Sequence, residues 1–407
     1  MNILFPWKIA EATGWGSYGK GLVLALRRAG HGVVLLDGIA SEAGPIHAAP
    51  FLLARSVSGP KVMLHPVGNS FGARLASLKD EADFHVALVV AESTTLTPPQ
   101  VENLQTYDLL LSGCEWFRGV LAGYHLPSIA FPQGVDTLTF SPARQRPPRP
   151  ANDPFLIFSG GKFEYRKGHD LVIETFKQLR RRFPEIPARL VCAWHNFWPD
   201  TVGPLQFTGH LTSLPAFSTE SGQWNFPAWL PTQGIRAEDT IFLPPLLPEQ
   251  MAAVIRECDA GLFLSRAEGN VNMSLAECAA TGIPCVVSGN TGHLSYLTEP
   301  LITLASTWPT HRVPHGYTGA EGWGEVKPEE CAAMLAMIAK DGPASASRRG
   351  IVTADIDGYR ECDLYMPDGG LPAFEATDFA SRWSWDVRAS ALVTLIQERS
   401  SFPNRGY

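Results

Sequence analysis

The chain has 407 residues, of which 45% are hydrophobic and 18% are charged. This composition is typical of a globular protein with two or three domains and excludes the disordered, collagenous and coiled-coil classes. The formal net charge of −7 argues against a whole-surface nucleic-acid binder, which would carry a basic surface.

Seven cysteines are scattered along the chain without a CxxC pair. We therefore expect no disulfide framework, no structural zinc site and a reducing, cytoplasmic location. Lys8 and Glu11 interrupt the N-terminal segment before a signal-peptide core can form. Apolar runs such as 86–91 have the length of a buried strand and fall short of a membrane span.

The first 140 residues alternate short apolar runs with amphipathic stretches. Leu22, Val23 and Leu26 share one face of a helix predicted over 20–30. A second helix is predicted at 116–124. Strands buried on both faces, with helices between them, indicate a parallel, doubly wound sheet. The predicted strands are 2–7, 32–37, 62–66, 85–93, 108–113 and 128–134.

A stretch rich in proline and arginine, 143–154, predicts a linker between two such halves. The N-terminal domain is expected to span 1–142 and the C-terminal domain 155–382. A terminal helix, placed at 383–407 and carrying Val387, Leu392 and Leu395 on its apolar face, is expected to complete the first domain. The second half has a predicted helix at 168–182 and predicted strands at 155–161, 188–194, 240–244, 260–266 and 285–288.

An aromatic-rich segment, about 195–236, departs from this alternation. One interpretation is a surface insertion with a small aromatic cluster of its own. The other is a lid or an acceptor platform, because long loops on a rigid scaffold often carry function.

Three places suit ligand chemistry, and the first is the glycine-rich stretch 14–21. We expect it to form the turn between strand 1 and helix 1, where backbone N–H groups can bind a phosphate. Gly14, Gly16 and Gly19 also match GxGxxG, and Asp37 ends the next strand, so a dehydrogenase stays an alternative. A tight turn without a ligand is the plainer interpretation.

The second place is the basic loop 161–168, which follows the first strand of the second half. Lys162, Arg166 and Lys167 concentrate positive charge where a doubly wound sheet binds ligands. Such charge stabilises a departing pyrophosphate. A solvated basic loop is the alternative.

The third place is 265–288. Glu268 follows a predicted strand, and Glu277 lies one turn into the helix that begins near 272–274. A loop carboxylate can hold a polar substrate, a helix carboxylate can accept bonds from paired hydroxyls, and amides at the helix start can bind phosphate. Taken singly, both acids are ordinary surface charges.

Together these places resemble the retaining glycosyltransferases of family 4 (glycosyl transferases group 1). The stretch 109–142, with Gly134-Val135-Asp136 before Phe140 and Pro142, is similar to that family's end-of-first-domain signature. The loop 161–168 resembles its donor-phosphate loop, and 242–269 its donor-binding core. The resemblance implies the α/β GT-B fold, in which two Rossmann-like, doubly wound parallel-sheet domains face a central cleft.

The resemblance also implies residue roles. Glu268 is expected to contact the donor sugar, Glu277 the ribose hydroxyls, and Lys162 and Lys167 the diphosphate. Gly14 matches the glycine of the family's first loop, and the base is expected near Leu247. The remaining donor-binding residues are expected to be Trp15, Gly16, Gly269, Asn270, Val271 and Asn272.

The sequence departs from the family pattern in three ways. Eight residues separate Glu268 from Glu277, whereas the family has seven, which indicates a longer sugar loop. Lys162 stands where arginine is more common and loses the planar fork. Glu92 and Ser93 stand where many members have a histidine near the reacting carbon, with His65 and His85 as alternatives in the same domain.

The expected activity is retaining, metal-independent transfer of a hexose from a nucleotide diphosphate sugar to an acceptor hydroxyl. Glu268, Glu92 and Lys167 are the candidate catalytic residues, no metal ligand is assigned, and the donor is a co-substrate, so no cofactor is expected. Alternatives are a GT-B phosphorylase or epimerase and a non-catalytic nucleotide-sugar-binding protein. The acceptor is a glycan, a lipid or a small molecule, no nucleic acid is expected, and peripheral contact with the inner membrane surface stays open.

Overall fold

The chain folds into two compact units, Met1–Thr137 with Gly269–Met273 and Phe379–Tyr407, and Leu138–Glu268 with Ser274–Asp378. The predicted linker falls outside the described residues except for 153–154, and so does the end of the predicted terminal helix, 401–407. The computed structural model describes residues 1–10, 13–37, 59–74, 78–142, 153–296, 299, 301–310, 319–341, 354–355, 358–359 and 376–400.

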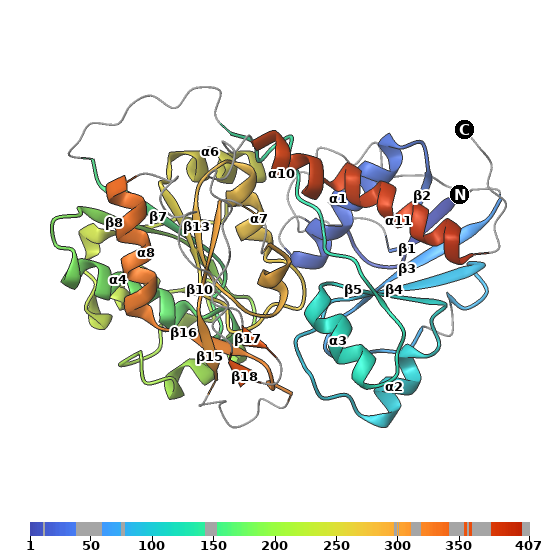
Figure 1. Ribbon diagram of the computed structural model, residues 1–407, viewed down its shortest axis with the longest axis horizontal. Coiled ribbons are helices and arrows are strands. Elements are labelled where there is room, and N and C mark those ends of the chain that lie inside the picture. The colour runs from blue at the N-terminus through green and yellow to red at the C-terminus, as the bar shows by residue number, and fades with distance from the viewer. Residues whose placement is uncertain are drawn as a thin grey trace. The chain divides into compact units, whose positions relative to one another are not determined.

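The first unit is built on a six-stranded sheet whose strands are all parallel (Figure 1). The strands are short apolar runs such as 84–89, which are buried because helices flank the sheet. This confirms the predicted parallel sheet. The order is β2(Gly32–Leu35), β1(Asn2–Phe5), β3(Lys61–Val67), β4(Phe84–Val89), β5(Leu109–Ser112) and β6(Ile129–Ala130). The helices of this unit are α1(Gly14–Arg28), α2(Pro98–Leu104), α3(Glu115–Gly123) and α11(Trp385–Arg399). Helix α10(Ala376–Trp383) belongs to it from Phe379 onward.

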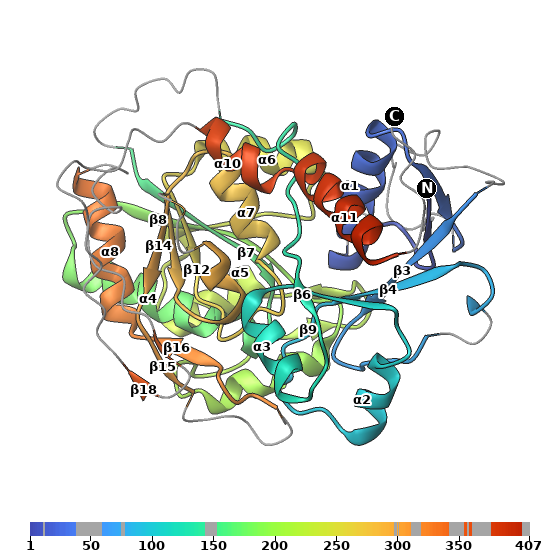
Figure 2. The same ribbon diagram turned by 45° about the vertical axis from the view of Figure 1, so that its right-hand side comes forward.

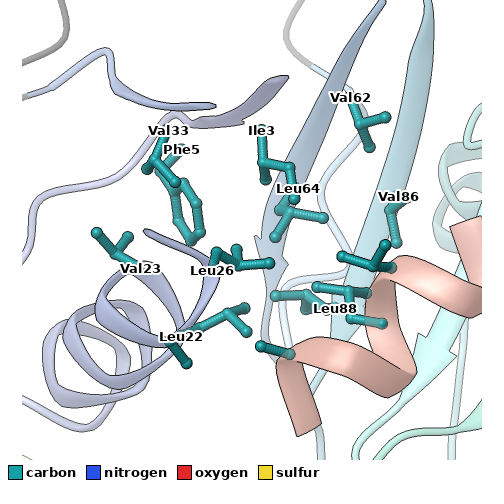
Figure 3. Close-up of a cluster of buried hydrophobic side chains, with 14 of the residues drawn as sticks. Ile3, Phe5, Leu22, Val23, Leu26, Val33, Val62, Leu64, Val86 and Leu88 are labelled. Atoms are coloured by element: carbon teal, nitrogen blue, oxygen red, sulfur yellow. The ribbon is translucent and has the colours of Figure 1, made fainter. Parts of the chain in front are cut away.

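The core of this unit lies between α1 and the sheet (Figure 3). Leu22 and Leu26 reach from the helix toward strand residues such as Ile3 and Leu64. Helix α11 lies beside α1 (Figures 1 and 2) and contributes a buried stripe at i, i+4, i+7, i+8 and i+11. The residues of that stripe are Trp385, Ala389, Leu392, Val393 and Ile396.

Val387 is the exception to the predicted apolar face of this terminal helix. It lies off the buried stripe and is 38% exposed, so it does not share a buried face with Leu392 and Leu395. Leu392 is buried and Leu395 is partly buried against the core, as predicted.

The glycine-rich stretch 14–21 is helical, which corrects the prediction of a turn. Helix α1 begins at Gly14, and the side-chain oxygen of its N-cap, Thr13, accepts from the Gly16 N–H at 3.1 Å. A Cβ on Gly16 would lie 2.1 Å from the Ala10 carbonyl oxygen, and one on Gly21 2.1 Å from Nε1 of Trp385. These glycines therefore permit close packing within the unit.

The second unit also has a six-stranded parallel sheet. Counted along the chain, its strands run in the order 3-2-1-4-5-6, so the order reverses between β7 and β12. The order is β11(Thr240–Phe242), β8(Ala188–His195), β7(Phe155–Lys162), β12(Ala260–Phe263), β13(Cys285–Ser288) and β14(Ile302–Ala305). The α-helices are α4(His169–Arg182), α5(Phe226–Trp229), α6(Pro248–Glu257), α7(Met273–Ala280) and α8(Pro328–Asp341).

Helices α4 and α8 lie side by side (Figures 1 and 2), joined by a hydrogen bond from Arg182 to the Glu329 carbonyl at 3.0 Å.

Short elements complete this unit. The two 3-10 helices used below are η3(Tyr165–Lys167) and η8(Thr291–Tyr296). Antiparallel pairs are β9(Phe217–Ser218) with β10(Gln223–Trp224), β15(Thr307–Pro309) with β16(Gly324–Val326), and β17(Ala354–Asp355) with β18(Gly358–Tyr359).

The aromatic segment 195–236 is joined to the core of the second unit. Phe226 and Trp229 are buried, and their rings lie 4.8 Å and 5.7 Å from that of Phe163, which follows β7. These aromatic side chains therefore pack on the domain core and do not form a separate cluster. Phe197 and Trp198, by contrast, are about half exposed.

Among the described residues, no helix combines the length and the apolar character needed to cross a membrane.

Candidate functional site

The site lies at the point where the strand order of the second unit reverses. Open parallel sheets bind ligands at the carboxyl ends of the two strands that flank this point, here β7 and β12. Gly168 brings the two following loops together, because its φ is +65° and a Cβ there would lie 1.9 Å from the Leu264 carbonyl oxygen. A hydrogen bond from the Arg266 N–H to the Arg166 carbonyl at 2.7 Å joins the same loops.

Five charged side chains of alternating sign form a row across these loops. Lys162 Nζ lies 2.6 Å from one Glu164 oxygen, and Arg166 donates to the other at 2.8 Å. Arg166 also donates to Glu268 Oε2 at 3.1 Å. Lys167 Nζ lies 2.7 Å from Glu268 Oε1 and 2.8 Å from Oε2. Since the row has three cations and two carboxylates, it carries a net positive charge that suits an anion.

Glu268 is one of two buried carboxylates in this row, and 4% of its surface is exposed. Ser265 donates its hydroxyl to Oε1 at 2.6 Å, in addition to the bonds from Lys167 and Arg166. Burial disfavours the charged form, but the two cations outweigh it and lower the pKa of Glu268 to about 2. The carboxylate is therefore ionised at neutral pH.

The structure thus brings Glu268 and Lys167 together, although the sequence analysis gives them separate ligands. A diphosphate that takes Lys167 would have to compete with Glu268 for it. The resulting arrangement can exchange a carboxylate for a phosphate on the same ammonium group. Both are hard oxygen anions that make charge-assisted bonds to lysine.

A second ion pair, fully buried, holds the two loops in place. The Arg266 guanidinium donates to both Asp170 oxygens, at 2.8 Å and 2.6 Å, and to the Tyr165 carbonyl at 2.6 Å. It also donates to Glu325 of β16 at 2.5 Å. Neither Arg266 nor Asp170 is exposed. Although burial opposes ionisation, the Arg266 charge keeps the pKa of Asp170 below its usual range.

The loop after β13 approaches Glu268 from the other side. The Glu268 N–H donates to Thr291 Oγ1 at 2.8 Å, and the Gly292 N–H donates to the Glu268 carbonyl at 3.0 Å. Thr291 has φ +43°, a backbone conformation that is rare for a β-branched residue and is associated with functional sites. His293 Nε2 lies 4.0 Å from Glu268 Oε1.

The loop 269–272 follows Glu268 and belongs to the first unit. Asn270 Oδ1 accepts from the Val271 N–H at 2.7 Å and from the Gln133 N–H at 3.1 Å. A Cβ on Gly269 would lie 2.5 Å from the Ala91 carbonyl oxygen. Asn270, Val271 and Asn272 are buried.

Two further predicted donor residues lie on helices of the second unit. Glu277 is the fifth residue of α7 and is partly buried. Leu247 is the partly buried N-cap of α6.

Glu92 lies in the first unit, after β4. Asn69, which follows β3, donates to Glu92 Oε2 at 2.7 Å, and its amide oxygen accepts from the N–H groups of Glu92 and Ser93 at 2.8 Å and 2.9 Å. Asn69 therefore fixes both the side chain and the backbone of Glu92. The alternatives, His65 and His85, hydrogen-bond each other at 3.0 Å inside the sheet.

The start of α1 holds the predicted residues Gly14, Trp15 and Gly16. Gly14 is exposed. The Trp15 carbonyl accepts from Trp7 Nε1 at 3.1 Å, and the Gly16 N–H is capped by Thr13. The structure thus uses the Gly16 N–H within the helix cap, where the sequence analysis expects it to face a phosphate.

Several residues of the site are not assigned by the sequence patterns. Glu164 had a local signal, because Lys162, Glu164 and Arg166 alternate in sign at every second position. Arg266 and His293 had none, because their partners lie far away in the sequence. Arg166 belongs to the predicted basic loop, but spacing along the chain does not indicate its bond to Glu268.

No group of three or more His, Cys, Asp or Glu side chains is placed to hold a metal ion, as far as the described residues go.

Comparisons with known proteins give the fold. No protein-family model and no curated protein matches the chain. Solved structures do match over nearly the whole length. A sucrose-phosphate synthase from Thermosynechococcus elongatus has a TM-score of 0.60 and 14% identity, with 98% of each chain covered. A glycosyltransferase from Rickettsia africae has a TM-score of 0.62 and 10% identity, with 99% of each chain covered.

A third match is a trehalose-6-phosphate protein from E. coli bound with UDP-2-fluoro glucose. Its TM-score is 0.60 at 12% identity, and the match covers 99% of this chain and 100% of that one. At these identities the similarity shows the fold. The two α/β units, each with a six-stranded parallel sheet, match GT-B glycosyltransferase structures, and the predicted fold class is confirmed.

Proposed function

We propose that the protein is a glycosyltransferase that uses a nucleotide diphosphate sugar, with retention at the anomeric carbon, as in family 4. The observation that carries the proposal is the row of Lys162, Arg166 and Lys167 at the ligand-binding edge of a GT-B-like sheet. Glu164 and Glu268 hold these cations in place. Matches with solved structures described as binding UDP or a UDP-sugar support the same class of donor.

In this reaction the bond between the anomeric carbon and the diphosphate oxygen breaks, and the acceptor oxygen bonds to that carbon. Lys167, Arg166 and Lys162 stabilise the negative charge that develops on the leaving diphosphate. Glu268 orients the sugar hydroxyls, and the departing phosphate takes the acceptor proton. The three side-chain cations supply positive charge without a bound metal.

Glu92, held by Asn69, is proposed to orient the acceptor. Glu92 follows β4, and the bond from Asn69 fixes its side chain. Such a position suits a group that must hold one geometry. The acceptor class is a glycan, a lipid or a small molecule.

The test is sugar release and transfer from UDP-, GDP-, ADP- and dTDP-glucose, measured for the intact chain and for Glu268→Gln. Turnover of one donor that falls at least about tenfold in Glu268→Gln supports a transferase. Binding of a donor without any sugar release, in the presence of glycan, lipid and small-molecule acceptors, supports the non-catalytic alternative. Sugar-1-phosphate formation from free phosphate supports the phosphorylase.

A further inference from the structure

His293 is a buried histidine that the proposed mechanism does not use. It lies on η8, and none of its surface is exposed. Its Nδ1 lies 3.0 Å from the Ser288 carbonyl oxygen. Because a carbonyl oxygen only accepts, Nδ1 carries a proton. The Ser288 hydroxyl, 3.1 Å from Nδ1, donates instead to the Ser265 carbonyl at 2.5 Å.

The other ring nitrogen has no hydrogen-bond partner. Nε2 is buried and unpaired, and it points toward Glu268 Oε1 at 4.0 Å. In the neutral ring, Nε2 has a lone pair and no proton, so it faces a carboxylate to which it cannot donate. A buried polar atom in this state costs free energy and is uncommon in native proteins.

The charged groups around His293 explain why its ring stays neutral. Burial is the largest effect, and with the nearby Lys167 and Arg166 charges it lowers the pKa to about 4, against the opposing influence of Glu268 and the Ser288 carbonyl. Lys167 and Arg166 reach this point from η3, and Glu268 from the loop after β12. Lys167 bonds both Glu268 oxygens, so the carboxylate charge that would otherwise stabilise an imidazolium is already paired with an ammonium group.

Movement of Lys167 would change this balance. Arg166 and Ser265 would still hold Glu268, through Oε2 and Oε1 respectively. The positive charge nearest Oε1 would be gone, and His293 Nε2 would lie within reach of that oxygen after a shift of about 1 Å, which brings 4.0 Å to a hydrogen-bond distance.

We propose that His293 is a positioning residue that replaces Lys167 as the cationic partner of Glu268 when an anionic ligand takes the lysine. One proton from solvent binds Nε2, and the new N–H donates to Glu268 Oε1. The charge beside Glu268 is thereby conserved, and the carboxylate stays ionised and fixed while the ammonium holds the ligand. The identification of that ligand as a diphosphate rests on the proposed function; the link between Lys167 and the protonation of His293 does not.

The first experiment needs no ligand. Ring ¹³C and ¹H shifts of the intact, histidine-labelled chain are followed from pH 5 to 8.5, with the His293 signal assigned by its absence in His293→Gln. The wild-type ring, whose pKa is lowered to about 4, should stay neutral over most of this range. In Lys167→Gln its titration midpoint is expected to rise by about 1–3 pH units, into the range. Lys162→Gln is the matched control, because Lys162 pairs with Glu164, and it should leave the His293 midpoint nearly unchanged.

A His293 that stays neutral throughout this range in Lys167→Gln overturns the proposal. So does an equal rise in Lys162→Gln, which would indicate a general field and not the exchange of one partner.

The second experiment counts protons during UDP binding, by calorimetry at pH 7.5 in buffers with different ionisation enthalpies. The wild-type protein is expected to take up more protons per UDP than His293→Gln, by up to one. His195→Gln is the control, because the pKa of His195 is also lowered, by burial and by Lys167 and Lys162. Equal proton counts in wild type and His293→Gln, or loss of the uptake in His195→Gln alone, overturn the proposal.

The two experiments separate the failure of this inference from that of the proposed function. A chain that binds none of the nucleoside diphosphates but shows the His293 shift in Lys167→Gln contradicts the function and supports the exchange. A chain that binds UDP without the His293 shift contradicts the exchange alone.

Discussion

The buried pair of Arg266 and Asp170 allows a quantitative prediction about the scaffold of the site. Replacing Arg266 by Met removes both bonds to Asp170 and the bond to the Tyr165 carbonyl, and leaves a carboxylate with no exposed surface beside an apolar side chain. Breaking one side of a buried pair costs about 3–5 kcal/mol. For a unit of this size, 1 kcal/mol corresponds to about 2–4 °C, so the transition of the second unit should fall by about 6–20 °C.

The assay is differential scanning calorimetry of the intact chain at pH 8 and at pH 5.5. In Arg266→Met the pKa of Asp170 should rise above its unfolded value, because burial then acts without the guanidinium. As the pH falls through a raised folded pKa, the buried carboxylate binds a proton in the folded state, and the cost of its unpaired charge is lost. The difference between variant and wild type should therefore shrink at pH 5.5.

The double variant Arg266→Met/Asp170→Leu provides the control. It removes the fully buried carboxylate, and Glu325, the other partner of Arg266, is 27% exposed, so the double variant should lose less stability than Arg266→Met alone. Equal or greater loss in the double variant, together with a difference that does not change with pH, would refute the assignment of the cost to the stranded carboxylate.

Two further predictions concern the two units separately. Gly168→Ala places a Cβ 1.9 Å from the Leu264 carbonyl oxygen at φ +65°, so it should lower stability by more than about 1 kcal/mol in urea unfolding, whereas Gly203→Ala, with open space around the added Cβ, should change it little. In the first unit, burial and the charges of His85 and Arg74 lower the pKa of His65 to about 4. Since the folded pKa lies below the unfolded one, the contribution of neutral His65 to the free energy of unfolding should be fully present above about pH 6.5. It should be lost as the pH falls from there toward pH 4. His65→Leu should flatten this decline in stability measured against pH; an unchanged decline would contradict the assignment.

The sheets could be predicted from the sequence because their strands carry a local signal. The apolar stretch within 85–93 cannot face water on either side, which indicates a central strand of a parallel sheet, and β4 is that strand. The apolar face at the start of the terminal helix could be predicted less well. Val387 fits an apolar pattern, but the stripe that begins at Trp385 leaves it exposed.

Glycine was the ambiguous signal. The glycines of residues 14–21 have low helix propensity, which favours a turn. Tertiary packing overrides propensity here, since Ala10 and Trp385 leave no room for a Cβ on Gly16 or Gly21. Such contacts come from segments that the local sequence does not specify.

The candidate site was predictable in its residues and not in its pairing. The positions of Lys167 and Glu268 after two strands placed both at the ligand edge. That Lys167 bonds both Glu268 oxygens, and that His293 faces the same carboxylate, depends on three loops brought together by the sheet order. Spacing along the chain carries no record of such contacts.

The central claim is that Lys167 binds the diphosphate of a nucleotide donor, and calorimetric titration tests it most directly. UDP, GDP, ADP and dTDP would each be titrated into the wild-type protein, and the one that binds would be compared with its nucleoside in Lys167→Ala. Loss of a charge-assisted bond should weaken the diphosphate by about 1.5–3 kcal/mol, or roughly ten- to a hundredfold, and leave the nucleoside nearly unchanged. Lys177→Ala, which removes a lysine paired within α4 to Glu174, should change neither. Equal weakening of the nucleoside and the diphosphate in Lys167→Ala, or no binding of any diphosphate, would contradict the claim.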